Sequence, residues 1–249
     1  MELKPSFSAG PLLIVPVLVF LAACGGEVSH SCLVQRPGLG GYLFVMDRTS
    51  PVSGGAGCDD TVLPARLADN IRFDKIGQDQ LTVVFRSELL TPLDASGQPA
   101  FPTDTADVGR GQIGASPDPQ GICTVSSFST ANATSALDGT PPNPPRSVTL
   151  SHTRFLSAPA YQGSQAESDA TYTVGACSAT YHGLLLTPIA ECSSDAACNP
   201  FADPANGRAA GSGVNPLYPV TCNTEVGALY GLSDGVCWLA GTTFPVLQQ

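Results

Sequence analysis

Apolar and polar residues alternate with a period of two in several short stretches of this chain. The clearest pair is 71–76 and 81–86, where residues such as Ile71 and Val83 alternate with polar or charged ones. A period of two is typical of strands that bury one face. Because only four residues, including Gly77, separate the two stretches, we expect them to form a β-hairpin.

Short segments rich in strand-forming residues recur along the chain. Further strands are predicted at 42–46, 122–129, 148–155, 171–177 and 180–186. Only 61–70 favours one or two helical turns, limited by Pro64. With 26 glycines, 22 prolines and 13% charged residues, the chain suits short strands joined by tight turns. We therefore predict a mainly β fold, an antiparallel sandwich or open barrel-like meander, with a disulfide-rich C-terminal region.

Three segments depart from the strand pattern. Residues 91–121 form a long, polar, proline-punctuated loop, which is either a surface excursion or a binding loop. Residues 131–146 contain four prolines within five positions and read as a stiff connector. Residues 191–249 hold four cysteines and few apolar runs. The predicted organisation is thus a β domain over 42–190 followed by a cysteine-rich C-terminal region over 191–249.

The N-terminal apolar run, Pro11–Ala23, leads into Leu21-Ala22-Ala23-Cys24. At about 1.5 Å per residue it spans only about 20 Å of a hydrocarbon core about 30 Å thick, so an export signal fits better than a spanning helix. The four residues resemble the lipobox of bacterial lipoproteins. That resemblance implies a signal peptide over 1–23, diacylation of Cys24 as the first mature residue, and a lipidated tether over 24–41.

Gly25, rather than aspartate, follows Cys24. In lipoproteins this implies anchoring at the outer membrane, on its periplasmic or its outer face. The alternative is an ordinary secretory signal with a chance cysteine. A net charge of −10 and a pI near 4.5 disfavour nucleic acid and anionic lipid surfaces as partners. We expect membrane attachment through the acyl chains on Cys24, with an envelope protein or a surface glycan open as partner.

The other cysteines form an even set, which in an exported protein predicts up to four disulfides. They are Cys32, Cys58, Cys123, Cys177, Cys192, Cys198, Cys222 and Cys237. Proximity along the chain predicts pairs of Cys32 with Cys58 and of Cys123 with Cys177, with the last four pairing among themselves. A metal site is the alternative, but no Cys-x-x-Cys occurs and histidine is scarce.

Two glycine motifs have the form of catalytic or nucleotide-binding signatures. Gly231–Gly235 satisfies G-x-S-x-G around Ser233, but that motif needs a strand before it, a helix after it and a later histidine, and no histidine follows. A β-turn is the better interpretation. Gly109–Gly114 satisfies G-x-G-x-x-G, but the Pro117 and Pro119 that follow cannot open a long helix, so a glycine-rich loop is favoured.

Other candidate residues have two interpretations each. His152 and His182 lie in predicted strands and would form a metal or acid–base pair if the sheet joined them to a carboxylate; otherwise they are plain strand residues. Trp238, the only tryptophan, with Tyr218 and Tyr230, either lines a sugar or peptide site or fills a small core. Loop oxygens suited to calcium occur at Asp104, Asp107, Asp118, Asp195, Asp203 and Asn206.

These features predict a membrane-anchored envelope lipoprotein with a non-catalytic binding or structural role. We expect no catalytic residue, no metal and no cofactor. One alternative is a secreted hydrolase that uses Ser233. The other is a calcium- or carbohydrate-binding β module that uses the long loops.

Overall fold

A computed structural model describes residues 31, 32, 34, 41–77, 81–90, 107–133, 144–156, 163–206 and 210–247. The predicted signal peptide, Cys24 and most of the predicted tether lie outside these described residues.

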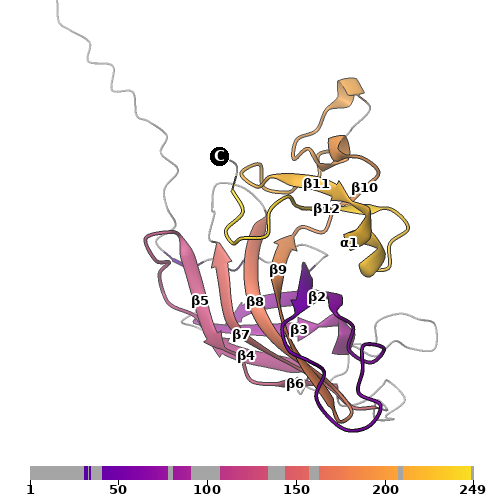
Figure 1. The fold of residues 1–249 in the computed structure, drawn as a ribbon. Helices are drawn as coiled ribbons and strands as arrows, with labels where there is room; N and C mark the ends of the chain where they lie inside the picture. Colours follow the sequence, from indigo (N-terminus) through magenta and orange to yellow (C-terminus); the bar gives the residue numbers. More distant parts are fainter. Residues whose placement is uncertain are drawn as a thin grey trace, which may run out of the picture.

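Strands dominate the described parts of the chain (Figure 1). The strands are β1 (Tyr42–Arg48), β2 (Arg66–Ile76), β3 (Thr82–Ser87), β4 (Val108–Gln112), β5 (Ile122–Ser127), β6 (Ala131–Asn132), β7 (Arg146–Leu156), β8 (Ser164–Val174), β9 (Cys177–Thr187), β10 (Glu191–Cys192), β11 (Val220–Asn223) and β12 (Gly235–Leu239). The helical elements are η1 (Glu88–Leu90), η2 (Asp195–Cys198), η3 (Pro204–Asn206) and α1 (Thr224–Leu229).

The first nine strands form an antiparallel sheet in the order β4-β3-β2-β1-β9-β8-β7-β5. The short strand β6 also pairs with β7, at the start of β7, whereas β5 pairs with the later part of β7. The two outer edges meet where Gly111 of β4 bridges to Phe128 and where the Ser129 amide donates to the Arg110 carbonyl at 2.8 Å. A Cβ on Gly111 would lie 2.5 Å from Val125, so only glycine permits this approach. The sheet is therefore a nearly closed barrel, which confirms the mainly β prediction in its barrel form.

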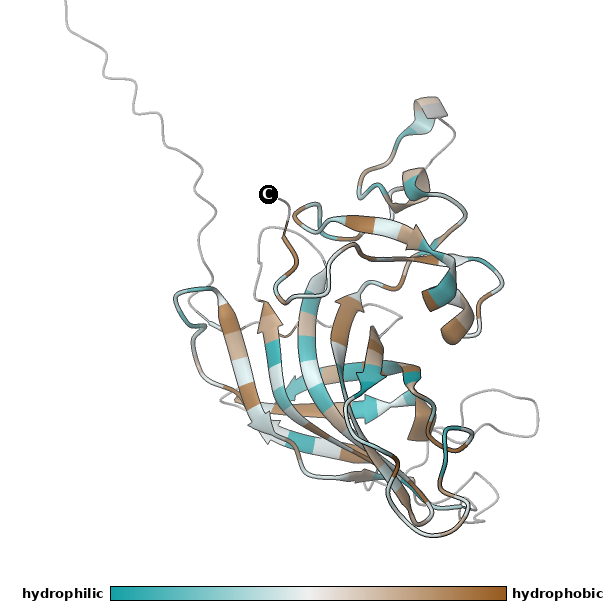
Figure 2. Cartoon of the chain, in the orientation of Figure 1, coloured by the Kyte–Doolittle hydropathy of each residue, from teal (hydrophilic) through white to brown (hydrophobic). Residues whose placement is uncertain are grey.

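Period-two alternation separates the inside of the barrel from its outside. Figure 2 shows the alternation as bands of hydrophilic and hydrophobic residues along β7 and β8. Aromatic rings fill the interior: Phe73 packs edge-on against Phe155, with ring centroids 5.0 Å apart, and against Tyr42 at 5.5 Å. The predicted hairpin of 71–76 and 81–86 is confirmed as the pair β2 and β3.

The C-terminal region packs on the outer face of the barrel (Figure 1). Leu43 of β1 and Leu184 of β9 point outward into a second apolar core that contains Trp238 and Phe244. The buried amide of Gln165 donates to the Val246 carbonyl at 2.8 Å and accepts from the Val246 amide at 2.7 Å. Because both faces of β1 are covered, its sequence reads as a continuous apolar run.

Three sequence predictions are wrong in detail. Residues 61–70 do not form a helix: the Leu63 amide closes a single turn on the Asp59 carbonyl at 3.1 Å, and β2 then begins at Arg66 and pairs with β1. The predicted loop 91–121 contains β4, whose glycine-rich sequence carries little β propensity and becomes a strand by pairing with β3. The predicted connector 131–146 begins with β6 and ends with the first residue of β7, although 134–143 lie outside the described residues.

All eight cysteines of the predicted set form disulfides, but two predicted pairs are wrong. The bonds are Cys32–Cys123, Cys58–Cys177, Cys192–Cys222 and Cys198–Cys237. Ser53 bridges to Ser178, which brings the loop after β1 to the start of β9. The Cys32 amide donates to the Ala115 carbonyl in the loop that leads from β4 to β5. Strand neighbours therefore decide these pairs, rather than proximity in sequence. The last four cysteines pair among themselves.

Candidate functional site

A row of charged and polar side chains crosses the outer face of the barrel over five neighbouring strands. The register places Arg66 of β2 opposite Asp47 of β1, Asp47 opposite His182 of β9, and His182 opposite Asp169 of β8. His152 of β7 completes this row, which we call the transverse row. Basic and acidic groups alternate along it, so each side chain has a neighbour of complementary character.

Asp169 joins the two histidines of the transverse row. Its Oδ2 lies 2.8 Å from Nδ1 of His152, and its Oδ1 lies 2.8 Å from Nδ1 of His182. Burial alone would raise the pKa of Asp169, but hydrogen bonds and charge from His182 and His152 outweigh it and lower the pKa. The carboxylate is thus ionised at neutral pH, and each imidazole donates an Nδ1–H to it. The structure therefore unites the two histidines that sequence analysis placed in separate strands.

A β-bulge positions His152. The pairing of β7 with β8 shifts between Ser151 and Arg154, and among the described residues His152 is the one non-glycine with a positive φ, of 51°. Such a backbone conformation costs about 1–3 kcal/mol and persists only when the surroundings enforce it. The extra residue turns His152 outward beside Asp169. Bulges with this re-aiming effect recur next to functional sites.

Glu167 lies one outward position from Asp169 along β8, and its side chain is only 15% exposed. One of its oxygens, Oε1, accepts a hydrogen bond from the Arg154 guanidinium, which also stacks over the Phe244 ring at 5.2 Å. The other oxygen, Oε2, lies 3.9 Å from Nε2 of His182. Arg154 thus fixes the Glu167 carboxylate and leaves Oε2 facing the histidine.

A groove of about 220 Å³ lies between the barrel and the C-terminal region, over one end of the transverse row. Asp47, Arg66 and His182 line it from the barrel, and Trp238 lines it from β12. The Arg66 guanidinium contacts Asp47 at 3.5 Å and Glu225 of α1 at 2.7 Å, so its orientation is held from both sides. The groove therefore combines an indole with fixed charges, as small-ligand sites do.

A second polar cluster lies inside the barrel, around Asp69 of β2. Its carboxylate accepts hydrogen bonds from the hydroxyls of Ser87 at 2.6 Å and Tyr172 at 2.7 Å, and from the Leu89 amide at 3.2 Å. Burial raises the pKa of Asp69 to about 6 against these stabilising hydrogen bonds. Asp69 was not among the residues predicted from the sequence. The available signal was a carboxylate at an inward position of β2, in phase with Ile71 and Phe73.

The glycine motifs do not form catalytic sites in the described parts of the chain. Ser233 is exposed on a bend that follows α1 and precedes β12, the reverse of the strand-then-helix order that a nucleophile elbow requires. The first two glycines of the G-x-G-x-x-G motif, Gly109 and Gly111, belong to β4. A Cβ on Gly109 would lie 2.0 Å from the Phe85 ring, so this glycine makes room for a core aromatic.

Several calcium candidates already serve local structure. Asp118 accepts from the amides of Gln120 and Ile122 in a turn, Asp195 accepts from the Cys222 amide at 2.7 Å, and Asp107 pairs with Arg86 at 3.1 Å. Asp104 lies outside the described residues, as does the side chain of Asn206. Asp203 lies in the loop just before η3.

The aromatic candidates divide between core and groove. Tyr218 is buried in the second apolar core, and burial raises its pKa to about 12. Tyr230 donates to Glu88 at 3.3 Å and accepts from Asn70 at 3.2 Å, which ties the end of α1 to the barrel. Trp238 is only 6% exposed, so it fills the core and borders the groove at the same time.

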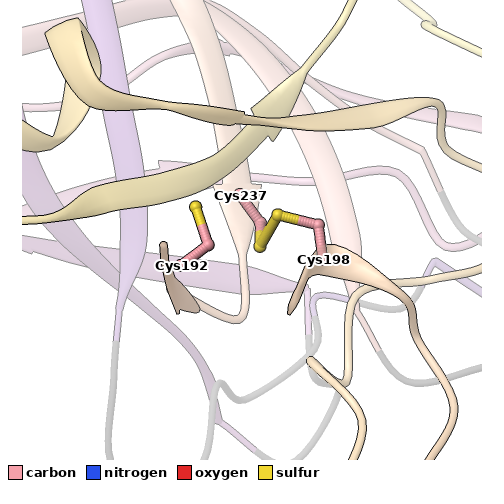
Figure 3. A group of neighbouring side chains, drawn as sticks. All are labelled: Cys192, Cys198 and Cys237. Carbon is pink, nitrogen blue, oxygen red and sulfur yellow. A yellow bond between two sulfur atoms is a disulfide. The ribbon is translucent and has the colours of Figure 1, made fainter. Parts of the chain in front are cut away.

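Three cysteine sulfurs gather in the C-terminal region (Figure 3). Those of Cys192, Cys198 and Cys237 all lie within 4.8 Å of one another. A zinc site would need thiolates, but Cys198 is bonded to Cys237 and Cys192 to Cys222. The group is therefore two adjacent disulfides that cross-link β10, β11, β12 and η2.

Fold and cysteines together define a disulfide-stapled antiparallel β-barrel protein, and four disulfides indicate an extracytoplasmic location. The MlpA family model matches residues 54–188, and the chain belongs to the MlpA family. Comparison with curated proteins and with solved structures finds no match. The matched segment contains His152, Asp169 and His182, whereas Trp238 lies beyond it. Within the described residues, no helix has the length and apolar character needed to cross a membrane.

Proposed function

We propose that this protein is a lipid-anchored, non-catalytic binding protein of the bacterial envelope. Acyl chains on Cys24 hold it at the outer membrane, and the groove beside Trp238 binds its ligand. The groove carries this proposal because two bodies that are each cross-linked by disulfides form its walls. Such walls are largely preformed, which lowers the entropic cost of binding.

Three observations support the anchoring. Leu21-Ala22-Ala23-Cys24 follows a short apolar run, MlpA-like proteins are lipoproteins, and the net charge of −10 gives the protein no electrostatic attraction to anionic lipid. Two or more acyl chains bind a membrane stably where a single chain does not. Intact-mass measurement of the protein extracted from envelopes tests this step. We expect the wild type to carry the added mass of acyl chains on Cys24. The C24A variant should be released from the membrane fraction.

The lining of the groove favours a carbohydrate as ligand. A sugar ring presents an apolar face and a rim of hydroxyls, which match an indole edge and the fixed groups of Asp47 and Arg66. A lipid-anchored protein of the envelope also lies within reach of the glycans of that envelope. We therefore propose an envelope glycan as the ligand.

The single tryptophan gives a direct assay. Because Trp238 lines the groove and no other tryptophan exists, its fluorescence responds to a ligand that enters this groove. We expect a saturable change on titration with oligosaccharides released from the organism's own lipopolysaccharide or peptidoglycan. The D47A variant should weaken binding at least about tenfold, as loss of a polar contact costs about 1.4 kcal/mol or more. No change with either oligosaccharide would refute the glycan proposal.

A further inference from the structure

We propose that His182 and Glu167, supported by Asp169 and His152, bind a divalent transition-metal ion such as Zn²⁺ or Cu²⁺ on the outer face of the barrel. This site lies beside the groove and shares only His182 with it. The inference goes beyond the proposed function, because a metal bound here requires no glycan.

The spacing between the two ligand atoms carries the inference. Nε2 of His182 and Oε2 of Glu167 are 3.9 Å apart, too far for a hydrogen bond. Zinc lies about 2.0–2.1 Å from imidazole nitrogen and about 2.0–2.2 Å from carboxylate oxygen. One ion placed between them would reach both atoms, and a side-chain shift of about 0.5 Å would bring them to the separation of about 3.4 Å that tetrahedral zinc requires, without movement of the backbone.

Hydrogen bonds hold the His182 imidazole in the form that binds metal. Because Nδ1–H donates to Asp169, the lone pair of the neutral ring is on Nε2, which is the atom facing Glu167. A carboxylate that accepts from the second nitrogen of a ligating histidine is the common outer-shell arrangement at zinc sites. Asp169 is therefore a positioning residue, and Arg154 has the same role for Glu167.

His152 gives the cluster a second imidazole. It is bound to the same carboxylate as His182, and its side chain is 75% exposed, so it is accessible to an ion arriving from solvent. The bulge and the positive φ that bring it there are costly, and an isolated surface histidine would not justify them. Water fills the remaining coordination positions on this exposed face.

The donor types select the class of ion. Imidazole nitrogen suits zinc and copper, whereas calcium and magnesium prefer six or more oxygen ligands. Glu167 pairs with the Arg154 guanidinium, whereas Asp169 contacts the two imidazoles, so two carboxylates stand against one guanidinium at the site. The net charge of −10 also attracts cations to the surface. The adjacent disulfides of Cys192, Cys198 and Cys237 offer no competing thiolate site.

Calorimetric titration of the full-length mature protein with ZnCl₂ at pH 7 tests the site. The protein is extracted in mild detergent, without a histidine tag and with its disulfides intact. We expect one Zn²⁺ per chain, with no heat from CaCl₂. H182Q should weaken Zn²⁺ binding at least about 100-fold, and E167Q and D169N about 10–100-fold, the range found for ligand and outer-shell changes. In a parallel titration, Cu²⁺ should quench Trp238 in the wild type and not in H182Q.

The third histidine of the chain provides the matched control. His30 is not part of the proposed site, so H30Q should bind Zn²⁺ as the wild type does. The inference would be overturned if the wild type bound no Zn²⁺, or if H182Q and E167Q bound it as tightly as the wild type does. Loss of Zn²⁺ binding in H30Q would also overturn it. Circular dichroism and thermal unfolding verify that each variant is folded. Because Glu167 does not line the groove, E167Q should keep the glycan response, so failure of one proposal is distinguishable from failure of the other.

Discussion

Asp69 should make this protein less stable at neutral pH than at mildly acidic pH. Its pKa rises from 3.8 in the unfolded chain to about 6 in the barrel interior, because burial disfavours the charged form. Between these values the folded state holds a proton that the unfolded state has lost. The contribution of Asp69 to stability is therefore fully present below pH 3.8 and is lost as the pH rises through about 6.

The magnitude follows from the size of the shift. A difference of about two pKa units corresponds to about 3 kcal/mol, at about 1.4 kcal/mol per unit. The carboxamide introduced by the D69N variant keeps the shape of the side chain but stays neutral at every pH. The free energy of unfolding of the wild type, minus that of D69N, should thus fall by about 2.5 kcal/mol between about pH 4 and about pH 8, and the rest of the change lies below about pH 4.

Urea denaturation at intervals across that pH range, with disulfides intact, measures this difference. Other titrating groups are shared by the two proteins and cancel in the comparison. The Y172F variant provides a second arm, since it removes a hydrogen bond that lowers the pKa of Asp69 and should move the fall to higher pH. A difference that stays constant within about 0.5 kcal/mol, or that grows with pH, would refute this account of the buried carboxylate.

Two further predictions concern the barrel and its cross-links. The C58S/C177S double variant should lose about 5 kcal/mol of unfolding free energy and the C192S/C222S variant about 4 kcal/mol, because the removed bonds span 119 and 30 residues. Equal losses in denaturation under non-reducing conditions would contradict this loop-entropy reasoning. G111A should lower the unfolding free energy by about 1–3 kcal/mol, with a matching fall in melting temperature, since its Cβ would lie 2.5 Å from Val125. In the control G55A the Cβ would meet nothing within 4 Å, so its melting temperature should change little. Similar shifts in the two variants would show that the barrel edges need no glycine.

Local sequence predicts most strands of this protein and carries the signals from which we infer its export. Alternation in 71–76 and 81–86 predicts the hairpin of β2 and β3 because a period of two is a property of neighbouring residues. The lipobox-like residues before Cys24 and the even set of eight further cysteines are equally local or compositional signals. These features need no knowledge of which strands become neighbours.

Tertiary structure decided how those strands combine. β4 is a strand because β3 pairs with it, although Gly109 and Gly111 give it low propensity. Cys58 meets Cys177 because β1 and β9 are neighbours, and no spacing along the chain contains that information. Trp238 borders a groove because the C-terminal region packs on the outer face of the barrel.

The histidine cluster shows the same division most clearly. Sequence alone places His152 and His182 in strands, where their relation to any carboxylate is open. The register of β8 and β9 brings His182 to Asp169, and a one-residue bulge in β7 turns His152 to the same carboxylate. A shift of one residue in either pairing would send these side chains to the opposite face, so the candidate site depends on long-range register, which the local pattern does not encode.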